Sequence, residues 1–408
     1  MAIAASPAAR GQQGWADEHW VGTWSASMQG PVNFAGRTSP SAGFENQTLR
    51  MIVRATIGGH RARVRVSNAY GEAALTVGAA HIALHRAGAA IVPASDRALT
   101  FSGRASITIP PGSEVLSDAV DLDVPESGDL AISIYLPSKS GTPTWHSTGL
   151  HTTYISGAGD FTSTADIPDA TKQPAWYWLK GVDVTAAPGT GAVVAFGDSI
   201  TDGARSTVDT DSSWPSELAR RLLARPGHPG ALAVLNAGIS GNRIWHDQIG
   251  SNALERLGRD ALGQQGAEYM IVLLGINDIG FANIPNVGAD QVVSADDVIA
   301  GLRQLVERAH VRGMKVFGST LLPFEGANYF SADAEVKRVA VNNWIRTGGA
   351  FDGVIDFETA VRDPEHPTKV SAAYDSGDHL HPNDAGYKAM GDAIDLSLFS
   401  QSQAHKKH

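Results

Sequence analysis

Residue types able to carry out acyl transfer occur at the ends of predicted strands in the second half of the chain. Ser199 lies three residues after the end of the apolar run 193–196, and polar segments rich in Gly, Asn, Asp and His lie at 236–243, 275–278 and 378–382. Acyl transfer needs a hydroxyl, a base that takes its proton, a carboxylate that orients the base, and donors for the oxyanion. These segments supply all of them. Open parallel sheets bind ligands at the carboxyl ends of their strands, so we expect the segments to converge there.

The stretch around Ser199 also has a plain structural interpretation. Gly, Asp and Ser are favoured in turns and at helix starts, so 197–203 taken alone fits a turn and helix cap as well as it fits a nucleophile. We expect Asp198 and Asp202 to be turn and cap residues rather than acid–base groups.

Composition narrows the class of protein. The 408 residues include no cysteine and carry a formal net charge of -10, which excludes thiol nucleophiles, disulfides and thiolate metal sites. The charge is spread without a basic stripe, so we expect no nucleic-acid partner. No apolar run approaches the roughly 20 residues that span a bilayer, and we expect a soluble protein with no membrane partner. The Ala-rich start fits a trimmed export signal or a cytoplasmic terminus, and we favour an extracytoplasmic location.

Residues 19–187 follow a period of two. In 61–66, 120–124 and 130–136, apolar side chains alternate with polar or small ones, which places one face of each strand on a core. Turn residues separate these runs, and no helical stretch of comparable length interrupts them. We therefore expect an all-β sandwich with a jelly-roll-like arrangement.

Residues 186–191 have the composition of a linker, and strands and helices alternate beyond them. The predicted strands are the apolar runs 193–196, 233–235, 270–274, 316–322 and 354–357. Helices are predicted at 214–223, after the capping box 294–297, after Ser331, and from about Asn383 to Ala393. This alternation predicts an α/β domain with helices on both faces of a parallel sheet. The predicted division is a flexible N-terminus at 1–18, a β-domain at 19–187, an α/β domain at 188–400 and a tail at 401–408.

From about Val193 to the last helix, the chain resembles the SGNH, or GDSL-type, serine hydrolases. Four blocks match in order and spacing, namely Gly197-Asp198-Ser199, the glycine of 239–242, Gly275-Ile276-Asn277-Asp278, and Asp378-x-x-His381 followed by Pro382. One such triplet is weak evidence, whereas four in order make chance agreement improbable. The resemblance implies a flavodoxin-like three-layer α/β/α fold and a reaction that needs no cofactor.

The resemblance also implies a role for each matching residue. Ser199 would be the nucleophile, His381 the general base, and Asp378 the carboxylate that orients His381. The oxyanion hole would consist of the main-chain N–H groups of Ser199 and Gly241 and the side-chain amide of Asn277. The Gly-x-Ser-x-Gly elbow of the α/β-hydrolases is absent at Ser199, so we do not expect the lid or the nucleophile elbow of that family.

His379 is a second candidate for the base. The family places the base three residues after the carboxylate, which is Asp378 here, and Pro382 helps to fix the turn before the helix. We therefore favour His381. The surrounding cluster, with Asp375 and Asp384 added, would also suit a metal, but such loops are common before helices and no helix-spaced His pair accompanies it, so we expect none.

Arg243, Trp245 and His246 follow Gly241 and are candidates for lining the acyl or leaving-group pocket. A solvated loop with one packed Trp is the alternative. In the first half, the opening Trp20-Val21-Gly22-Thr23-Trp24-Ser25 is similar to that of two-domain GDSL hydrolases resembling arylesterases and xylan-degradation-associated esterases. Trp145-His146 and Trp176-Tyr177-Trp178 would form a stacking surface for a sugar or, as is commoner, pack between the domains.

The predicted function is hydrolysis of short-chain esters, with acetyl or small acyl groups on carbohydrate or aryl alcohols, through an acyl-enzyme. The expected partner is therefore a small-molecule or carbohydrate ester. Two alternatives stay open. One is a carbohydrate-binding protein with a vestigial hydrolase domain, and the other is a longer-chain lipase or lysophospholipase-type acylhydrolase.

Overall fold

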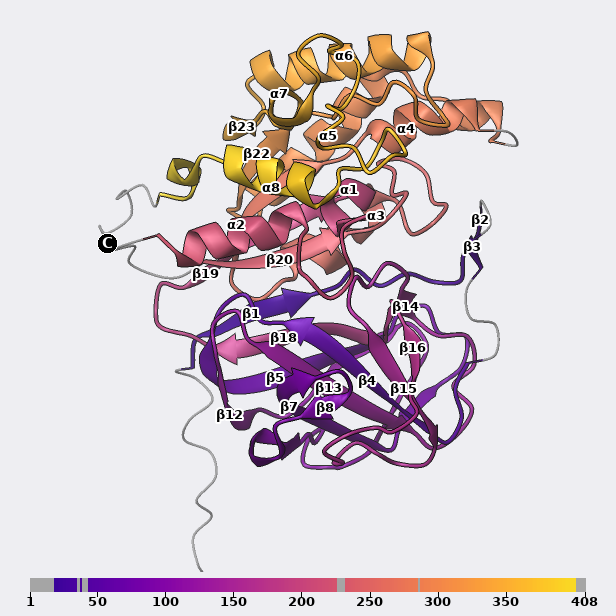
Figure 1. The fold of residues 1–408 in the computed structure, drawn as a ribbon, viewed down its shortest axis with the longest axis vertical. Coiled ribbons are helices and arrows are strands. Elements are labelled where there is room, and N and C mark those ends of the chain that lie inside the picture. The colour runs from indigo at the N-terminus through magenta and orange to yellow at the C-terminus, as the bar shows by residue number, and fades with distance from the viewer. Residues whose placement is uncertain (1–17, 35–36, 39–42, 226–231, 285–286, 401–408) are drawn as a thin grey trace, which may run out of the picture.

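The computed structural model describes residues 18–34, 37–38, 43–225, 232–284 and 287–400 (Figure 1). The predicted flexible N-terminus, apart from Glu18, and the predicted tail 401–408 lie outside these residues. None of the helices in the described ranges has the length and apolar composition needed to cross a bilayer.

Strands fill the first half of the described chain. They are β1 (Trp20–Ser25), β2 (Asn33–Phe34), β3 (Arg37–Thr38), β4 (Gln47–Arg54), β5 (Gly59–Asn68), β6 (Leu75–Val77), β7 (Ala79–Ala87), β8 (Ala90–Ile91), β9 (Arg97–Ala98), β10 (Ile107–Ile109), β11 (Ser113–Leu116), β12 (Val120–Val124), β13 (Asp129–Leu136), β14 (Trp145–His146), β15 (Thr153–Ala158), β16 (Thr171–Gln173), β17 (Trp176–Tyr177) and β18 (Leu179–Thr185). One sheet has the order β1-β18-β5-β11 with β12 beside β5, and a second has the order β16-β15-β4-β13-β7-β8 with β9 beside β7. The three strands predicted from alternation are confirmed as parts of β5, β12 and β13.

The alternation of β13 does not leave its second face in solvent. Leu130, Ile132 and Ile134 enter the main core, as predicted, but Ala131 is also buried, in a smaller apolar cluster with Tyr154 and others. Both faces of β13 are therefore covered over most of its length.

Strands and helices alternate in the second half. The strands are β19 (Gly191–Gly197), β20 (Leu232–Gly238), β21 (Ala267–Leu273), β22 (Lys315–Ser319) and β23 (Gly353–Ile355), and the helices are α1 (Ser199–Asp202), α2 (Trp214–Leu223), α3 (Ala253–Leu257), α4 (Ile276–Gly280), α5 (Ala295–His310), α6 (Ala332–Thr347), α7 (Phe357–Val361) and α8 (Asp384–Ala393). The strands pair in parallel in the order β20-β19-β21-β22-β23. Every residue of β19 is buried, which explains its uninterrupted apolar run.

Three predicted strands end earlier than their apolar runs, the run 270–274 by one residue at Leu273. The run 316–322 is a strand only as far as Ser319, and Phe357 begins α7 instead of ending a strand. Leu321 and Leu322 are buried although they lie in a loop. Burial of loop residues lengthened the apolar pattern beyond the paired strand.

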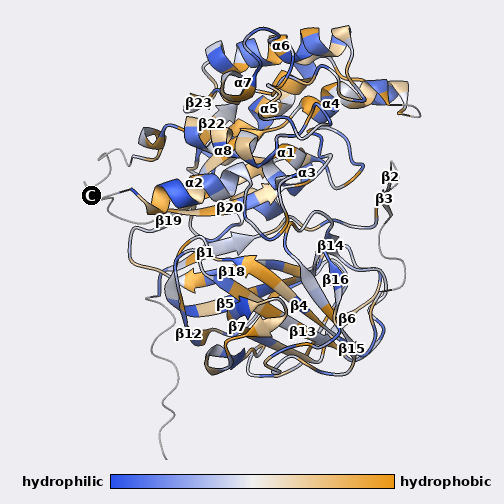
Figure 2. Ribbon diagram, viewed as in Figure 1, coloured by the Kyte–Doolittle hydropathy of each residue, from blue (hydrophilic) through white to orange (hydrophobic). Residues whose placement is uncertain are grey.

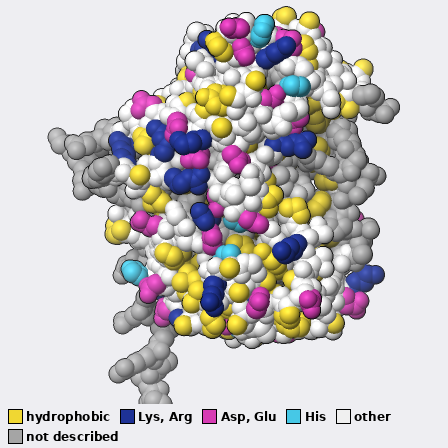
Figure 3. Space-filling view, in the orientation of Figure 1, with side chains coloured by type: hydrophobic (Ala, Val, Ile, Leu, Met, Phe, Trp, Pro, Cys, Tyr) yellow, Lys and Arg dark blue, Asp and Glu magenta, His cyan; other side chains and the backbone are white. Residues whose placement is uncertain are grey.

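Hydropathy and charge are distributed as expected for helices packed on a sheet. Hydrophobic residues are concentrated on the strands, while the helices show hydrophobic and hydrophilic residues side by side (Figure 2). On the face seen in Figure 3, acidic and basic side chains are intermixed and no single-sign stripe is visible.

The two halves of the chain share one apolar core and touch through backbone contacts. β1 lies against β20, the Ser25 hydroxyl donates to the carbonyl of Asn236 at 3.1 Å, and the Gly22 amide donates to the carbonyl of Gln265 at 2.9 Å. In Figure 1 the carboxyl end of the first half runs directly into β19. The strand-rich half thus packs against the sheet that carries Ser199.

The predicted capping signals are confirmed. Ser294 and Asp297 form a reciprocal capping box at α5, Ser331 caps α6, and Asn383 caps α8. In each case the side-chain oxygen accepts from a main-chain N–H that the first turn of a helix leaves without an intrahelical partner.

Replacing Ser294 by Ala should lower the free energy of unfolding by about 1 kcal/mol, because the Asp297 amide loses its acceptor. Urea denaturation would measure this loss. Ser294→Thr is the matched control, since it keeps the hydroxyl and should retain most of the stability. Equal losses in the two variants would contradict a capping role.

Candidate active site

Ser199 lies at the turn between β19 and α1. Asp198 is the N-cap of α1 and accepts from the Ile200 amide at 3.0 Å, so its predicted cap role is confirmed. A side chain at Gly197 would stand 2.0 Å from the Thr201 hydroxyl, so only glycine allows this sharp turn. Ser199 is buried at 4% exposure, and its hydroxyl points toward the loop before α8.

That loop brings His381 and Asp378 to Ser199. His381 Nε2 lies 2.8 Å from Ser199 Oγ, and His381 Nδ1 lies 2.8 Å from Asp378 Oδ2. The other oxygen of Asp378 accepts from the amides of Leu380 and His381. Burial opposes ionisation of Asp378, but these hydrogen bonds outweigh it and hold its pKa well below the ordinary value. An ionised Asp378 accepts from Nδ1–H, which leaves Nε2 free to accept from the serine hydroxyl.

Arg205 contacts the same carboxylate and was not expected from the sequence. Its Nε donates to Asp378 Oδ2 at 3.0 Å, and its side chain is 63% exposed. An exposed arginine in a loop carries no distinguishing pattern, so only the folded geometry identifies this partner.

The predicted oxyanion donors lie in neighbouring loops. Gly241 has a φ of +78°, and a Cβ there would stand 2.3 Å from Ile249, so both conformation and space require glycine. The Asn277 amide donates to the carbonyl of Asn242 at 3.0 Å, and its oxygen accepts from the Tyr329 hydroxyl at 3.2 Å. These two contacts fix which way the amide faces, and its second N–H remains for a ligand.

Two histidines of the same loop have different partners. His379 lies 2.6 Å from Asp375 and its side chain is 54% exposed, whereas His381 faces Ser199. Asp384 accepts from the amide and hydroxyl of Thr207. The carboxylates and imidazoles of this loop are therefore divided among separate pairs.

The candidate pocket residues occupy different depths. Arg243 is 1% exposed, lies over the Phe281 ring and donates to the side chain of Gln291. It therefore packs inside the protein and does not line an open surface. Trp245 is 38% exposed, and its indole N–H donates to the carbonyl of Asp297. His246 is half-buried, and its pKa is lowered by burial and by Arg243.

The aromatic residues proposed as a stacking surface are buried. The exposures of Trp145, Trp176, Tyr177 and Trp178 are 9%, 8%, 2% and 0%. Trp176 packs edge-on against Trp24, so these rings build the core of the first half and present no flat face to solvent. Packing and not sugar stacking therefore describes them, but their ring contacts lie within the first half and not between the domains as expected.

Part of the amino-acid sequence matches a known protein family. Residues 195–389 match the GDSL-like Lipase/Acylhydrolase family. This segment is a GDSL-type hydrolase domain. The match indicates an ester hydrolase.

The second half of the chain is also similar to solved structures at low sequence identity. An acetylxylan esterase from Geobacillus stearothermophilus is 22% identical, covers 52% of this chain and 96% of its own, and has a TM-score of 0.40. A GDSL-like lipase from Bacteroides thetaiotaomicron is 21% identical, covers 52% of this chain and 90% of its own, and has a TM-score of 0.35. No curated protein sequence matches the chain.

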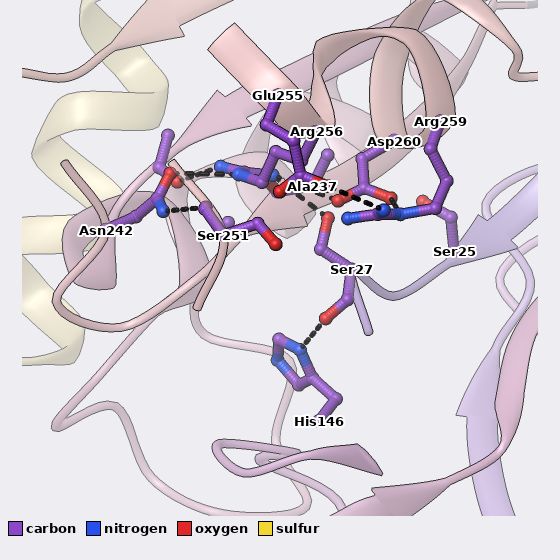
Figure 4. A network of polar contacts seen from close by, with 12 residues as sticks. Ser25, Ser27, His146, Ala237, Asn242, Ser251, Glu255, Arg256, Arg259 and Asp260 are labelled. Atoms are coloured by element: carbon purple, nitrogen blue, oxygen red, sulfur yellow. Dashed lines mark hydrogen bonds and ion pairs between the residues drawn. The ribbon is translucent and has the colours of Figure 1, made fainter. Parts of the chain in front are cut away.

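A buried arginine ties the loops of the GDSL-type domain together. Arg256 donates to the carbonyls of Gly197 and Ala237, each at 2.8 Å, and to the Asn242 side chain at 2.9 Å (Figure 4). Its guanidinium lies 4.1 Å from the centre of the Phe196 ring. Burial lowers its pKa to about 10, which leaves it charged at neutral pH. No sequence signal separates Arg256 from other helical arginines.

Two further carboxylates of the domain point inward. Asp278 accepts from the amides of Ile244 and Trp245, and burial raises its pKa to about 6. Asp202 was expected to serve the turn or cap, and this expectation is wrong. Its carboxylate accepts from Ser240 and faces His146 of the first half, because packing of the halves brings these loops over α1.

Asp198 is predicted to make stability depend on pH. It is fully buried, its Oδ2 has no partner among the described residues, and burial raises its pKa to about 7 from 3.8. A raised pKa contributes stability that is complete below about pH 4 and is lost as pH rises toward 7. The melting temperature of Asp198→Asn minus that of the unchanged protein should therefore increase from pH 4 to 7 and then level off.

Thermal unfolding from pH 4 to 8 would measure this difference. Asp296→Asn, at an exposed carboxylate, is the matched control. A flat difference for Asp198→Asn would show that Asp198 does not titrate in this range.

Proposed function

We propose that the chain hydrolyses short-chain carboxylic esters through an acyl-enzyme formed on Ser199. The observation that carries the proposal is the unbroken hydrogen-bonded line from Ser199 Oγ through His381 to Asp378, with 2.8 Å at both steps. Nucleophile, base and orienting carboxylate at these distances form the arrangement that acyl transfer requires.

The first half-reaction forms the acyl-enzyme. Ser199 Oγ attacks the ester carbonyl while His381 Nε2 takes the hydroxyl proton, and the imidazolium is stabilised by Asp378. Collapse of the tetrahedral intermediate breaks the bond to the alkoxy oxygen, and His381 returns the proton to the departing alcohol.

The second half-reaction uses water. His381 takes a proton from the water as its oxygen attacks the acyl carbonyl, the bond to Ser199 Oγ breaks, and the proton returns to Ser199. The carboxylic acid leaves and the enzyme is restored.

Charge on the oxyanion would be received by three donors. Within the described residues, the main-chain amides of Ser199 and Gly241 have no acceptor, and the Asn277 amide is held in place by Asn242 and Tyr329. Donors that are oriented before the reaction stabilise the developing charge without reorganising. This supports the roles proposed for all three groups.

The surface of the described loops supports a small acyl group. The exposed large hydrophobic residues are scattered, and those in loops near the carboxyl ends of the strands are single residues such as Val208, Trp245 and Val292. A long acyl chain needs a continuous apolar groove. We therefore place acetyl and other small acyl groups, on carbohydrate or aryl alcohols, ahead of lipids.

The proposal includes a finer description of the fold. In order along the chain, the strands of the second half are arranged second-first-third-fourth-fifth, which is the flavodoxin-like order. Contacts group α2, α7 and α8 together and α3 to α6 together, which supports two helical layers around the sheet. Two antiparallel sheets with a shared core support an all-β sandwich at 19–187, followed by the hydrolase domain at 188–400.

Replacing Ser199 by Ala should abolish hydrolysis of a short-chain nitrophenyl ester while the protein remains folded, because no acyl-enzyme can form. Release of nitrophenol measures the rate, and thermal unfolding checks the fold. Undiminished turnover would contradict the assignment. An inactive unchanged protein that retains polysaccharide would instead favour a carbohydrate-binding protein with a vestigial hydrolase domain.

The rate should be highest for acetyl esters and should fall as the acyl chain lengthens. A series of nitrophenyl esters from acetyl to palmitoyl, measured as kcat/KM with Ser199→Ala as the blank, tests this directly. A maximum at long chains would indicate a lipase or lysophospholipase-type acylhydrolase.

A further inference from the structure

The strand-rich half inserts two short segments against the loops that carry Ser199 and Gly241. Residues 26–29 follow β1, and residues 145–148 include β14. Gln29 donates to the carbonyl of Ile249 at 2.6 Å, and Thr148 donates to the hydroxyl of Ser240 at 3.0 Å. These contacts are polar and buried or nearly so, which makes them specific in geometry.

His146 is the charged member of these segments. Its side chain is 3% exposed, Nδ1 lies 2.7 Å from the carbonyl oxygen of Ser27, and Nε2 lies 2.9 Å from Asp202 Oδ1. A carbonyl and a carboxylate only accept, so both ring nitrogens donate and the imidazole carries a positive charge. Burial and Arg256 oppose this charge, but Asp202 and Ser27 outweigh them and raise the pKa of His146.

Asp202 connects His146 to the loop that contains Ser240 and Gly241. It ends α1, the helix that Ser199 begins, and its Oδ2 accepts from the Ser240 amide at 3.0 Å and from the Ser240 hydroxyl at 2.9 Å. Ser240 directly precedes Gly241, whose amide is a proposed oxyanion donor. One carboxylate therefore connects the nucleophile's helix with the loop that presents Gly241.

Ser27 makes a second connection from the same side. Its hydroxyl accepts from Arg256 at 3.2 Å, and Arg256 holds the side chain of Asn242. Figure 4 shows Ser27 between His146 and Arg256, with Asn242 beyond. The residues before and after Gly241 are thus both held through contacts with the strand-rich half.

Loss of the imidazolium would release Asp202. His146 and Asp202 border a cavity of about 80 Å³ between the halves, so water can reach a carboxylate that loses its partner. A hydrated Asp202 accepts hydrogen bonds from water and no longer fixes the Ser240 amide in one position. A small displacement of a catalytic donor lowers the reaction rate.

We propose that His146 is a positioning residue for ester hydrolysis, which holds the Gly241 amide in place through Asp202 and Ser240. The proposal rests on the proposed function of Ser199. It gives the strand-rich half a part in the reaction without any contact between that half and the substrate.

A matched pair elsewhere in the same interface provides the control. His151 of the first half lies 2.8 Å from Asp211 of the second, and the side chains are 7% and 9% exposed. Asp211 contacts Arg54 and not the loop 239–242 within the described residues. The two pairs resemble each other in chemistry and burial and differ in what they hold.

His146→Gln and His151→Gln should both lose stability, but only His146→Gln should lose catalysis. We expect kcat for a nitrophenyl acetate to fall roughly 10- to 100-fold in His146→Gln with KM within about twofold, and to change less than about threefold in His151→Gln. A merely structural role would affect both variants alike. Equal kcat values in the two variants, or an unchanged kcat in His146→Gln, would overturn the proposal.

Asp202→Asn tests the same connection with a side chain of nearly the same shape, and it serves if His146→Gln does not fold. It should lower kcat by a similar factor, and the double variant should lose no more than His146→Gln alone, because both act through one carboxylate. Additive losses would contradict the connection. Activity of the unchanged protein and inactivity of Ser199→Ala establish the hydrolase function independently of either result.

Discussion

The guanidinium of Arg256 is fully buried at the carboxyl ends of β19 and β20, and its N–H groups donate to several separate segments of the chain. The carbonyls of Gly197 and Ala237 lie at the carboxyl ends of the adjacent strands β19 and β20, the side chain of Asn242 belongs to the loop of Gly241, and Ser27 comes from the strand-rich half. A buried charge must satisfy its donors, so these segments cannot move apart without leaving N–H groups unpaired. The geometry proposed for catalysis depends on this constraint, because it fixes the ends of both strands before any substrate binds.

Buried carboxylates fix main-chain amides in position, as Arg256 fixes main-chain carbonyls. Asp198 holds the start of α1, Asp278 holds the amides of Ile244 and Trp245, and Asp202 holds Ser240. Loops have few repeating hydrogen bonds of their own, so side-chain acceptors replace them. Burial raises the pKa of Asp198 and Asp278, so keeping these carboxylates buried lowers the stability of the protein as pH rises. Their hydrogen bonds hold the loops in a single conformation.

The strand-rich half extends this network. Its residues Ser27 and His146 reach the partners of Arg256 and Asp202, and its aromatic residues form a core instead of an exposed platform. The strand-rich half contains no proposed reacting group, and it affects the reaction through these contacts. Its contribution is to the position of donors and not to the chemistry itself.

Local patterns in the amino-acid sequence are enough to predict the alternation of strands and helices, the caps at Ser294 and Asn383, and the residue types for acyl transfer, because periodicity and caps are local and each polar block follows its own strand. The approach of His381 to Ser199 was expected from family spacing, and its distances come from the fold. The contacts of Arg205, Arg256 and His146 with this site become visible in the folded chain alone. Their partners lie tens to more than a hundred residues away, and no local pattern distinguishes a buried, bonded side chain from a solvated one.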